Sequence, residues 1–345
     1  MNRLKTTLAF IVGCTVAALQ IPSAAFAQKV IHIETDNPAS YKAAIVRQEP
    51  IRLADDKGVA ILGIDQVQLC GDGFLVRDNR DLLYLFDKNG HMLSSSAKAF
   101  GKGNGQYGIC LAYSYNKRSG NIEVVVPDGI IFYDRDFKFV RKASFNNPGV
   151  DTLMFNRISD IDSHTHLLFS PLESENETAN YYVFDSKDNK LLAAREYPRL
   201  CRYITMQTQC LSGDSFMAFP CMNYTFYTFN AKSYACKPLV TFDFGAKALT
   251  KGETEGERDS VERRLLDSDK AMPLRTFKSG DTIISVVKEG TSRSSLKTVI
   301  VDCKSWRTTT VTGLPVPDAF ADGTLYSNAY DKATNSYYII KTHLK

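Results

Sequence analysis

Short apolar runs that end in an aspartate or asparagine recur along the chain. Each run holds aromatic and aliphatic residues, and a polar turn follows its last residue. The intervals between the closing residues are 47, 51, 45 and 72 residues, for Asp87, Asp134, Asp185, Asn230 and Asp302 in turn. A unit of about 45 to 50 residues with four short strands is typical of a propeller blade. The longest interval includes a polar stretch over residues 247–270, which we interpret as an insertion.

Turn residues divide each unit into four predicted strands. In the first unit, strands over residues 61–69, 74–77 and 82–86 precede a fourth strand that begins near His91. The intervening turns contain Asp-Gly and Asn-Gly pairs, which supply the positive φ that tight hairpins require. The second unit is marked by turns at residues 116–121 and 128–129. The third, fourth and fifth units begin near Ile158, Tyr203 and Met272.

The last unit, which begins at Ala319, has room for about two strands before the chain ends at Lys345. Two strand-like runs precede the first unit, at residues 29–35 and 43–53, and we expect them to complete the final blade. Such a joint hides the edge strands of the ring. The sequence therefore predicts an all-β, six-bladed propeller in one domain over residues 28–345. A β-sandwich is the structural alternative, but it would leave the regular spacing unexplained.

Two motifs resemble those of a known family. Residues 86–90, FDKNG, and 100–107, FGKGNGQY, are similar to the F-D-x-x-G and G-x-G-P-G-E-Y motifs of exported six-bladed propellers of Bacteroidetes, relatives of NHL-repeat and TolB-like propellers. Residues 49–53 are similar to the entry strand of that family. Asn104 replaces the proline of the second motif and Gln106 its glutamate. The resemblance implies a fold and an exported location, and it implies no general activity.

The first 27 residues have the features of an export signal. Arg3 and Lys5 precede an apolar run over residues 8–21, and Ala25 and Ala27 fit the A-x-A pattern of a signal-peptidase site. The run is shorter than the roughly 18 to 20 residues that span a bilayer. Residues 11–14 also resemble a lipobox, in which Cys14 would be lipidated. We expect cleavage after Ala27 and a location in the periplasm or at the cell surface.

Composition excludes several classes of protein. At 44% hydrophobic and 23% charged residues the chain can bury a large core, which excludes disorder and a coiled coil. The net charge is +4 and the basic residues form no stripe along the sequence, so we expect neither nucleic acid nor a membrane surface as a partner. We also expect a monomer. Seven cysteines follow Cys14. Their odd number favours packed thiols, although a bridge among Cys201, Cys210, Cys221 and Cys236 stays open.

Three arginines occupy equivalent positions in three units. Arg157, Arg202 and Arg275 lie 28, 28 and 27 residues before the closing residue of their units, where a first strand begins. In a closed ring they would converge at one mouth of the channel and could bind a carboxylate, sulfate or phosphate. Tyr107 has a similar offset and would form an aromatic wall beside them. The alternative is that each arginine pairs with a neighbouring acid.

Other motifs give weaker support for chemistry. Residues 103–108 satisfy G-x-G-x-x-G, but a strand pattern follows where a dinucleotide site needs a helix. His164 and His166 could face one metal ion, yet no third ligand is close in sequence, so exposed turn residues are the favoured interpretation. No nucleophile elbow of the form G-x-S-x-G is found. We therefore predict no catalytic residue, no metal and no cofactor.

The insertion is predicted to contain a short amphipathic helix over residues 259–269, with Val261, Leu265 and Leu266 at helical spacing. Loops of this kind often carry binding, so it could act as a flap. The sequence favours a non-catalytic exported protein that binds an anionic glycan or peptide at the channel mouth. The alternatives are a propeller lyase or glycan hydrolase that uses a channel metal, and a structural component of an envelope complex.

Overall fold

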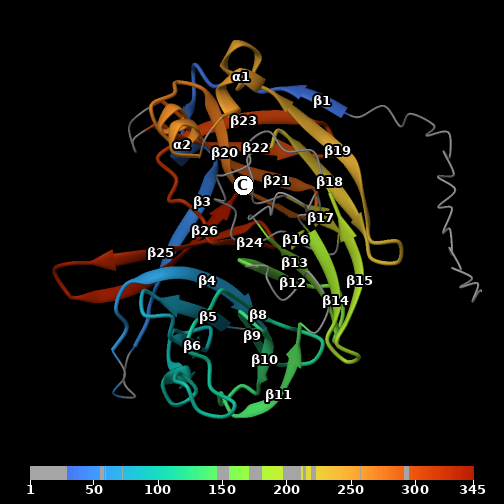
Figure 1. Cartoon of the computed structure of the whole chain (residues 1–345). Coiled ribbons are helices and arrows are strands. Elements are labelled where there is room, and N and C mark those ends of the chain that lie inside the picture. The colour runs from blue at the N-terminus through green and yellow to red at the C-terminus, as the bar shows by residue number, and fades with distance from the viewer. Residues whose placement is uncertain are drawn as a thin grey trace, which may run out of the picture.

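Six β-sheets surround a central channel (Figure 1). This computed structural model describes residues 29–345 except 55–57, 59, 72, 146–154, 171–180, 197–210, 213, 214, 219–222, 257 and 291–294. Several features named above lie outside the described residues: the predicted signal segment with Cys14, the arginine Arg202, and the cysteines Cys201, Cys210 and Cys221. The sheets follow the chain in order, so we number the blades 1 to 6. The prediction of a six-bladed propeller is confirmed.

Blades 1 to 3 are four-stranded antiparallel sheets, each built from consecutive strands. Blade 1 contains β4 Ile64–Cys70, β5 Gly73–Asp78, β6 Leu83–Phe86 and β7 Met92–Ser95, followed by the 3-10 turn η2 Ser96–Lys98. Blade 2 contains β8 Ala112–Tyr115, β9 Ile122–Val126, β10 Gly129–Tyr133 and β11 Phe139–Ser144. Blade 3 contains β12 Arg157–Asp160, β13 Thr165–Phe169, β14 Tyr181–Asp185 and β15 Lys190–Arg195.

Blades 4 to 6 each receive one additional strand from the N-terminal part of the chain. Blade 4 contains β16 Leu211–Ser212, β17 Phe216–Met217, β18 Thr225–Asn230 and β19 Ala235–Asp243. Blade 5 contains β20 Ala271–Ser279, β21 Thr282–Glu289, β22 Leu296–Asp302 and β23 Arg307–Thr312. Blade 6 contains β24 Ala319–Ala321, β25 Thr324–Asp331 and β26 Ser336–Leu344.

Residues 29–54, which we call the N-terminal ribbon, run along the outer edges of these three blades (Figure 1). Strand β1 Lys29–His32 pairs in parallel with β19, and β2 Ala39–Ser40 pairs in parallel with β23. After the 3-10 turn η1 Tyr41–Ala43, β3 Ile45–Arg52 pairs antiparallel with β26 and becomes the fourth strand of blade 6.

The closure of the ring was therefore predicted correctly for one of the two N-terminal runs. β3 completes the final blade as expected, but β1 belongs to blade 4, where its backbone pairs with Val240 to Asp243. The last blade also takes three strands from the C-terminal end rather than two. The difference arises because β1 is short and parallel to its partner, and sequence periodicity carries no information about which edge such a strand joins.

The first strands of the blades line the channel and contact their neighbours around the ring. Contacts join β4 with β8, β8 with β12, β16 with β20, β20 with β24, and β24 with β4. Between β12 and β16, the Leu211 backbone nitrogen donates to Ser159 Oγ at 3.4 Å. Each first strand therefore brings its polar side chains to one shared central space.

Apolar side chains fill the six interfaces between adjacent blades. Between blades 2 and 3, for example, Val125 and Phe132 pack with Leu168 and Phe184, and all four are fully buried. The middle strands are covered on both faces, which explains their continuous apolar runs such as Ile122–Val126. A charged residue within such a strand is buried whichever face it points to.

The chain between β19 and β20 folds into the 3-10 turn η3 Gly245–Lys247 and the helices α1 Lys251–Thr254 and α2 Arg258–Leu266. The predicted amphipathic helix corresponds to α2. Val261 and Leu265 are fully buried and pack with Leu249 and Met272, so the insertion has its own small apolar core. Among the described residues, no helix has the length and hydropathy required to cross a membrane.

Candidate functional site at the channel mouth

A cavity of about 570 Å³ opens at one mouth of the channel, where the first strands end. All six blades contribute to its wall. The residues that line it include Gln68 from β4, Ser114 from β8, Asp160 from β12, Leu211 from β16, Lys278 from β20 and Phe320 from β24. We call this space the channel cavity. A shallower hollow of about 500 Å³ lies on the outer side, where β3 meets the turn after β6.

Three cationic side chains line the channel cavity. Lys117 and Arg118 lie on the turn between β8 and β9 and are exposed, while Lys278 near the end of β20 is half-buried. The Asn116 side chain shapes that turn, because its Oδ1 accepts hydrogen bonds from the backbone nitrogens of Arg118 and Ser119 at 3.0 and 3.2 Å. Two acids, Asp160 and Asp322, also line the wall.

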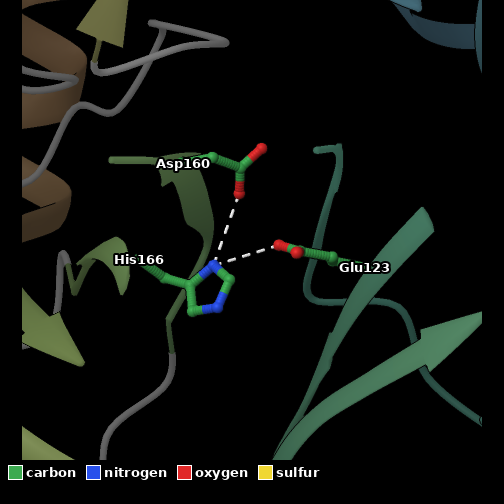
Figure 2. Close-up of side chains that lie close together, drawn as sticks. All are labelled: Glu123, Asp160 and His166. Carbon is green, nitrogen blue, oxygen red and sulfur yellow. Dashed lines mark hydrogen bonds and ion pairs between the residues drawn. The ribbon is translucent and has the colours of Figure 1, made fainter. Parts of the chain in front are cut away.

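Asp160 connects the channel cavity with a buried group of ionisable side chains (Figure 2). His166 Nδ1 lies 3.1 Å from Glu123 Oε2 and 3.3 Å from Asp160 Oδ1. The side chains of Glu123 and His166 have no exposed surface, and that of Asp160 is 12% exposed. We call Glu123, Asp160 and His166 the buried triad. It lies between blades 2 and 3, since Glu123 is on β9 and the other two are in the β12–β13 hairpin.

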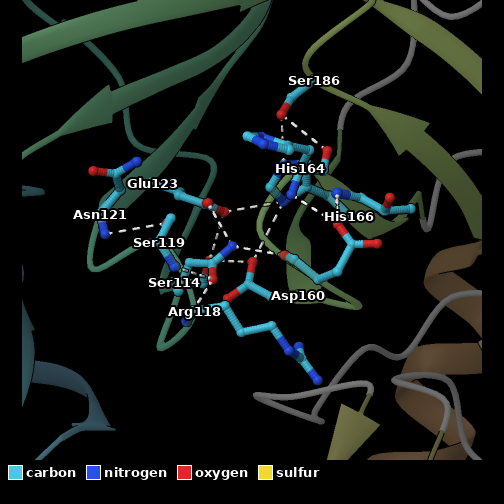
Figure 3. A network of polar contacts seen from close by, with 12 residues as sticks. Ser114, Arg118, Ser119, Asn121, Glu123, Asp160, His164, His166 and Ser186 are labelled. Carbon is cyan, nitrogen blue, oxygen red and sulfur yellow. Dashed lines mark hydrogen bonds and ion pairs between the residues drawn. The ribbon is translucent and has the colours of Figure 1, made fainter.

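A network of hydrogen bonds holds the buried triad in place (Figure 3). Asn116 Nδ2 donates to Glu123 Oε1 at 3.0 Å, and the Ser114 hydroxyl lies 3.3 Å from both Glu123 Oε2 and Asp160 Oδ1. On the opposite side of the imidazole, His166 Nε2 is 2.8 Å from Ser186 Oγ. These contacts satisfy the polar atoms that burial would otherwise leave without partners.

The Ser186 hydroxyl fixes the protonation of the His166 ring. Ser186 Oγ donates its hydrogen to the backbone oxygen of His164 at 2.9 Å and accepts a bond from Arg141 Nη2 at 2.9 Å. Because that hydrogen is already used, His166 Nε2 must itself carry a hydrogen and donate it to Ser186. The Nδ1 atom, which faces the two carboxylates, is then the position at which the ring gains or loses a proton.

Burial and charge raise two pKa values in the buried triad. Burial, together with the nearby Asp160 carboxylate, raises the pKa of Glu123 to about 8. Burial alone would lower the pKa of His166, but the carboxylates of Glu123 and Asp160 outweigh it and raise that pKa to about 9. Both groups therefore hold protons more tightly than free side chains do.

The two histidines predicted as exposed turn residues have different environments. His164 is exposed as predicted, but His166 is buried on β13, so that interpretation was wrong for His166. The acids that lie beside His166, Glu123 and Asp160, were not recognised in the sequence as its neighbours. Two signals could have identified them: Glu123 interrupts the apolar run Ile122–Val126, and Asp160 pairs with His166 in the register of a hairpin.

Two of the predicted arginines, Arg157 and Arg275, do not line the channel cavity. Arg157 begins β12 and its Nη1 donates to the Asn156 backbone oxygen at 2.5 Å, while Arg275 lies within β20. Arg275 Nη1 donates to buried Asp318 Oδ1 at 2.7 Å and to the Pro317 oxygen at 2.9 Å. For Arg275 the alternative of pairing with a neighbouring acid is therefore realised. The convergence of three arginines stays a prediction, because Arg202 is outside the described residues.

Tyr107 does not form an aromatic wall at the mouth. Its side chain is buried between blades 1 and 2, with only 1% exposed. The ring contacts Phe100 and Tyr133 edge-on, and its hydroxyl bonds Ser96 Oγ at 2.5 Å and the Asp81 oxygen at 3.0 Å. The prediction was wrong because the loop before β8 folds back into the interface between blades, which an offset along the sequence does not reveal.

Comparison with known proteins agrees with this architecture. Residues 24–281 match the model of a family described as a 6-bladed beta-propeller. The crystal structure of a Bacteroides fragilis protein assigned as exported superposes with a TM-score of 0.68 at 14% identity, over 92% of this chain and 99% of that chain. The WD40 domain of Neurospora crassa Pan2 is similar at a TM-score of 0.43 and 11% identity, over 81% of this chain and 75% of that one. Among curated proteins none matches the sequence.

Proposed function

Since the chain belongs to the 6-bladed beta-propeller family that matches residues 24–281, we propose that it is an exported, non-catalytic protein that binds an anionic ligand in the channel cavity. The export signal predicted at residues 1–27 supports the location, in the periplasm or at the cell surface. The exported assignment of the Bacteroides fragilis neighbour is consistent with it.

One observation carries the proposed binding role: the polar cavity where the first strands end contains Lys117, Arg118 and Lys278. Charged groups on a partly enclosed wall attract a ligand of opposite charge more strongly than isolated surface charges do. Arginine adds two parallel donors that match a carboxylate or sulfate. Figure 3 shows the Arg118 side chain extending away from the polar network that holds the buried triad.

The shape of the site favours a short glycan or peptide end over a small ion. A volume of about 570 Å³ is within the roughly 300 to 1,000 Å³ of ligand pockets in proteins. Three serines, Ser114, Ser159 and Ser279, and the apolar residues Leu69 and Phe320 also line the wall. Such a mixture suits a sugar acid, whose ring has polar edges and apolar faces.

Calorimetry with defined oligosaccharides tests the proposal. A tetramer of galacturonic acid is the anionic probe, and a neutral galactose tetramer is its control. We expect the acid to bind and the neutral sugar to bind weakly. Replacing Lys117 and Arg118 together by alanine should lower the affinity at least about tenfold, which corresponds to 1.4 kcal/mol.

The matched control replaces Lys187 and Lys190, two exposed lysines of the β14–β15 hairpin, by alanine. This variant removes two positive charges without changing the channel cavity, so it should bind as the unmodified protein does. Equal losses in both double variants would show that net charge alone drives binding. That result, or no binding of the acidic tetramer, would contradict a specific site at the channel mouth.

A further inference from the structure

Three potential metal ligands, one imidazole and two carboxylates, meet in the buried triad. The nitrogen of His166 and carboxylate oxygens of Glu123 and Asp160 all lie within 4.8 Å of one another (Figure 2). The distances of 3.1 and 3.3 Å from Nδ1 to the two oxygens are those of atoms that can share one cation at about 2.0 to 2.2 Å from each. The three side chains come from two blades, so the fold rather than one local motif brings them together.

The ring of His166 is oriented as a metal ligand requires. Metal-binding histidines commonly donate the hydrogen of their second nitrogen to a fixed oxygen, which determines the tautomer. Ser186 Oγ performs this role for Nε2 at 2.8 Å and is itself held by Arg141 and the His164 oxygen. The lone pair that remains, on Nδ1, points at the carboxylates and takes either a proton or a cation.

Hydrogen bonds also orient the two carboxylates toward the His166 nitrogen. Two buried negative charges side by side repel each other unless a positive charge lies between them. Asn116 Nδ2 holds Glu123 Oε1 at 3.0 Å, so Oε2 faces His166. The Ser114 hydroxyl, at 3.3 Å from an oxygen of each acid, adds a third oxygen beside the His166 nitrogen.

We propose that Glu123, Asp160 and His166 bind a divalent first-row transition metal ion such as Zn²⁺. A mixed set of one imidazole and two carboxylates suits Zn²⁺, whereas Ca²⁺ and Mg²⁺ prefer oxygen alone. The ion can enter from the channel cavity, because Asp160 both lines that cavity and contacts His166. The site does not depend on the anion-binding role proposed above.

Equilibrium dialysis of the purified protein against ZnCl₂, followed by elemental analysis, tests this site. We expect one Zn²⁺ per chain, and no comparable retention of Ca²⁺ when CaCl₂ replaces ZnCl₂. Glu123→Gln and Asp160→Asn keep the shape of the side chains and should each lower the Zn²⁺ affinity at least tenfold. Ser186→Ala, which leaves the three ligands intact but frees the His166 ring, should weaken binding by roughly 10- to 100-fold.

The control variant is His164→Ala, which removes an exposed imidazole next to the site and should bind Zn²⁺ normally. Replacing Lys117 and Arg118 by alanine should also leave Zn²⁺ binding unchanged, so failure of one proposal is distinguishable from failure of the other. X-ray absorption at the zinc edge, measured on the unmodified protein, gives a test that does not depend on the folding of any variant. It should show one imidazole nitrogen with oxygen ligands.

Three results would overturn the site. The first is no stoichiometric Zn²⁺ in the unmodified protein. The second is Zn²⁺ binding that Glu123→Gln and Asp160→Asn leave unchanged although both variants are folded by circular dichroism. The third is a preference for Ca²⁺ over Zn²⁺, which would exclude a transition metal.

Discussion

Glu289 is the centre of a charged cluster that attaches the N-terminal ribbon to blade 5. Lys247 Nζ lies 2.5 Å from Glu289 Oε1, and Lys297 Nζ lies 2.9 Å from Glu289 Oε2 and 2.7 Å from the Thr35 oxygen. Lys247 also pairs with Asp36 of the ribbon. Burial would raise the pKa of Glu289, but its bonds with Lys247, Thr35 and Lys297 outweigh this effect and lower that pKa.

The lowered pKa of Glu289 predicts the sign of a pH effect on stability. The ordinary pKa of a glutamate is 4.5, and that of Glu289 is lower in the folded state. Ionised Glu289 therefore stabilises the folded state fully at pH values above 4.5. This contribution is lost as the pH falls through the lowered pKa. Glu289→Gln should therefore reduce the free energy of unfolding at pH 7 by about 1 to 3 kcal/mol. The difference from the unmodified protein should shrink at pH 3, as measured by urea unfolding.

Asp136→Asn is the control for this experiment, because the Asp136 carboxylate is 69% exposed and its ion pair with Lys138 is long, at 3.6 Å. We expect a change below about 0.5 kcal/mol at either pH, as is usual for exposed pairs. A constant difference between Glu289→Gln and the unmodified protein from pH 7 to pH 3 would contradict the assigned role of Glu289.

Individual side chains were the least predictable part of the candidate site. Similar offsets placed Arg157 and Arg275 on first strands correctly, but offsets do not show that Asp318 pairs with Arg275. The contact between His166 and Glu123 was missed because the two residues lie 43 positions apart in sequence and meet only across two blades. Contacts of this kind depend on the packing of sheets, which periodicity does not encode.

Between strands, close approach of backbones makes particular glycines indispensable. Gly129 begins β10 and lies beside the last residues of β11, where a Cβ atom would come within 2.1 Å of the Ala143 oxygen. Its φ is not in the left-handed region, so the restriction is a matter of space alone. Ala143 is fully buried, and β11 could make room only by moving away from β10.

Gly129→Ala should therefore destabilise the protein by about 1 to 3 kcal/mol, the usual cost of an overpacked interior. Gly252→Ala is the matched control, because a Cβ atom at Gly252 in helix α1 would meet nothing within 4 Å. Alanine favours helix, so that variant should be neutral or slightly more stable. Thermal unfolding of both variants would decide the matter, and equal melting temperatures would count against the steric explanation.

Strands were predicted well where the pattern is repeated and poorly where it is not. The units marked by Asp87 and Asp134 became blades 1 and 2, because closely spaced turns and apolar runs specify antiparallel hairpins locally. β2 has only two residues, and β1 was expected as a strand but its sequence does not indicate its partner. Their positions follow from edges that blades 4 and 5 leave available, which only the assembled sheets define.

Closure of the ring depends on one strand of the N-terminal ribbon. β3 pairs with β26 from Arg52 opposite Tyr338 to Ile45 opposite Leu344, and its Ile51 packs against the apolar core that joins blades 6 and 1. β1 and β2 only extend edges of sheets that are already four-stranded. The three strands should therefore contribute very differently to stability.

Two truncations test this difference. Removing residues 29–44 should leave a propeller that unfolds cooperatively in urea at a lower midpoint, because β3 remains. Removing residues 29–53 should abolish cooperative unfolding, since blade 6 loses its outer strand.

A rearranged chain serves as the control for these truncations. The Lys345 nitrogen donates to the Ala44 oxygen at 3.0 Å, so the two ends of the final pair are adjacent. Attaching residues 45–53 behind Lys345 through a short turn should restore folding to the longer truncation. Failure of that chain to fold would contradict the assigned role of β3, as would cooperative unfolding of the chain that lacks it.

The path of the N-terminal ribbon also has a consequence for how the chain reaches its native state. β3 leaves the ribosome first among the strands of its blade but must wait for a partner about 290 positions later, as the bond between Gln48 and Thr342 illustrates. Closing so large a loop in one step is entropically costly. We expect docking of β1 on blade 4 and of β2 on blade 5 to hold β3 near β26 before the two strands pair. Refolding should therefore be slower in a chain that lacks residues 29–44.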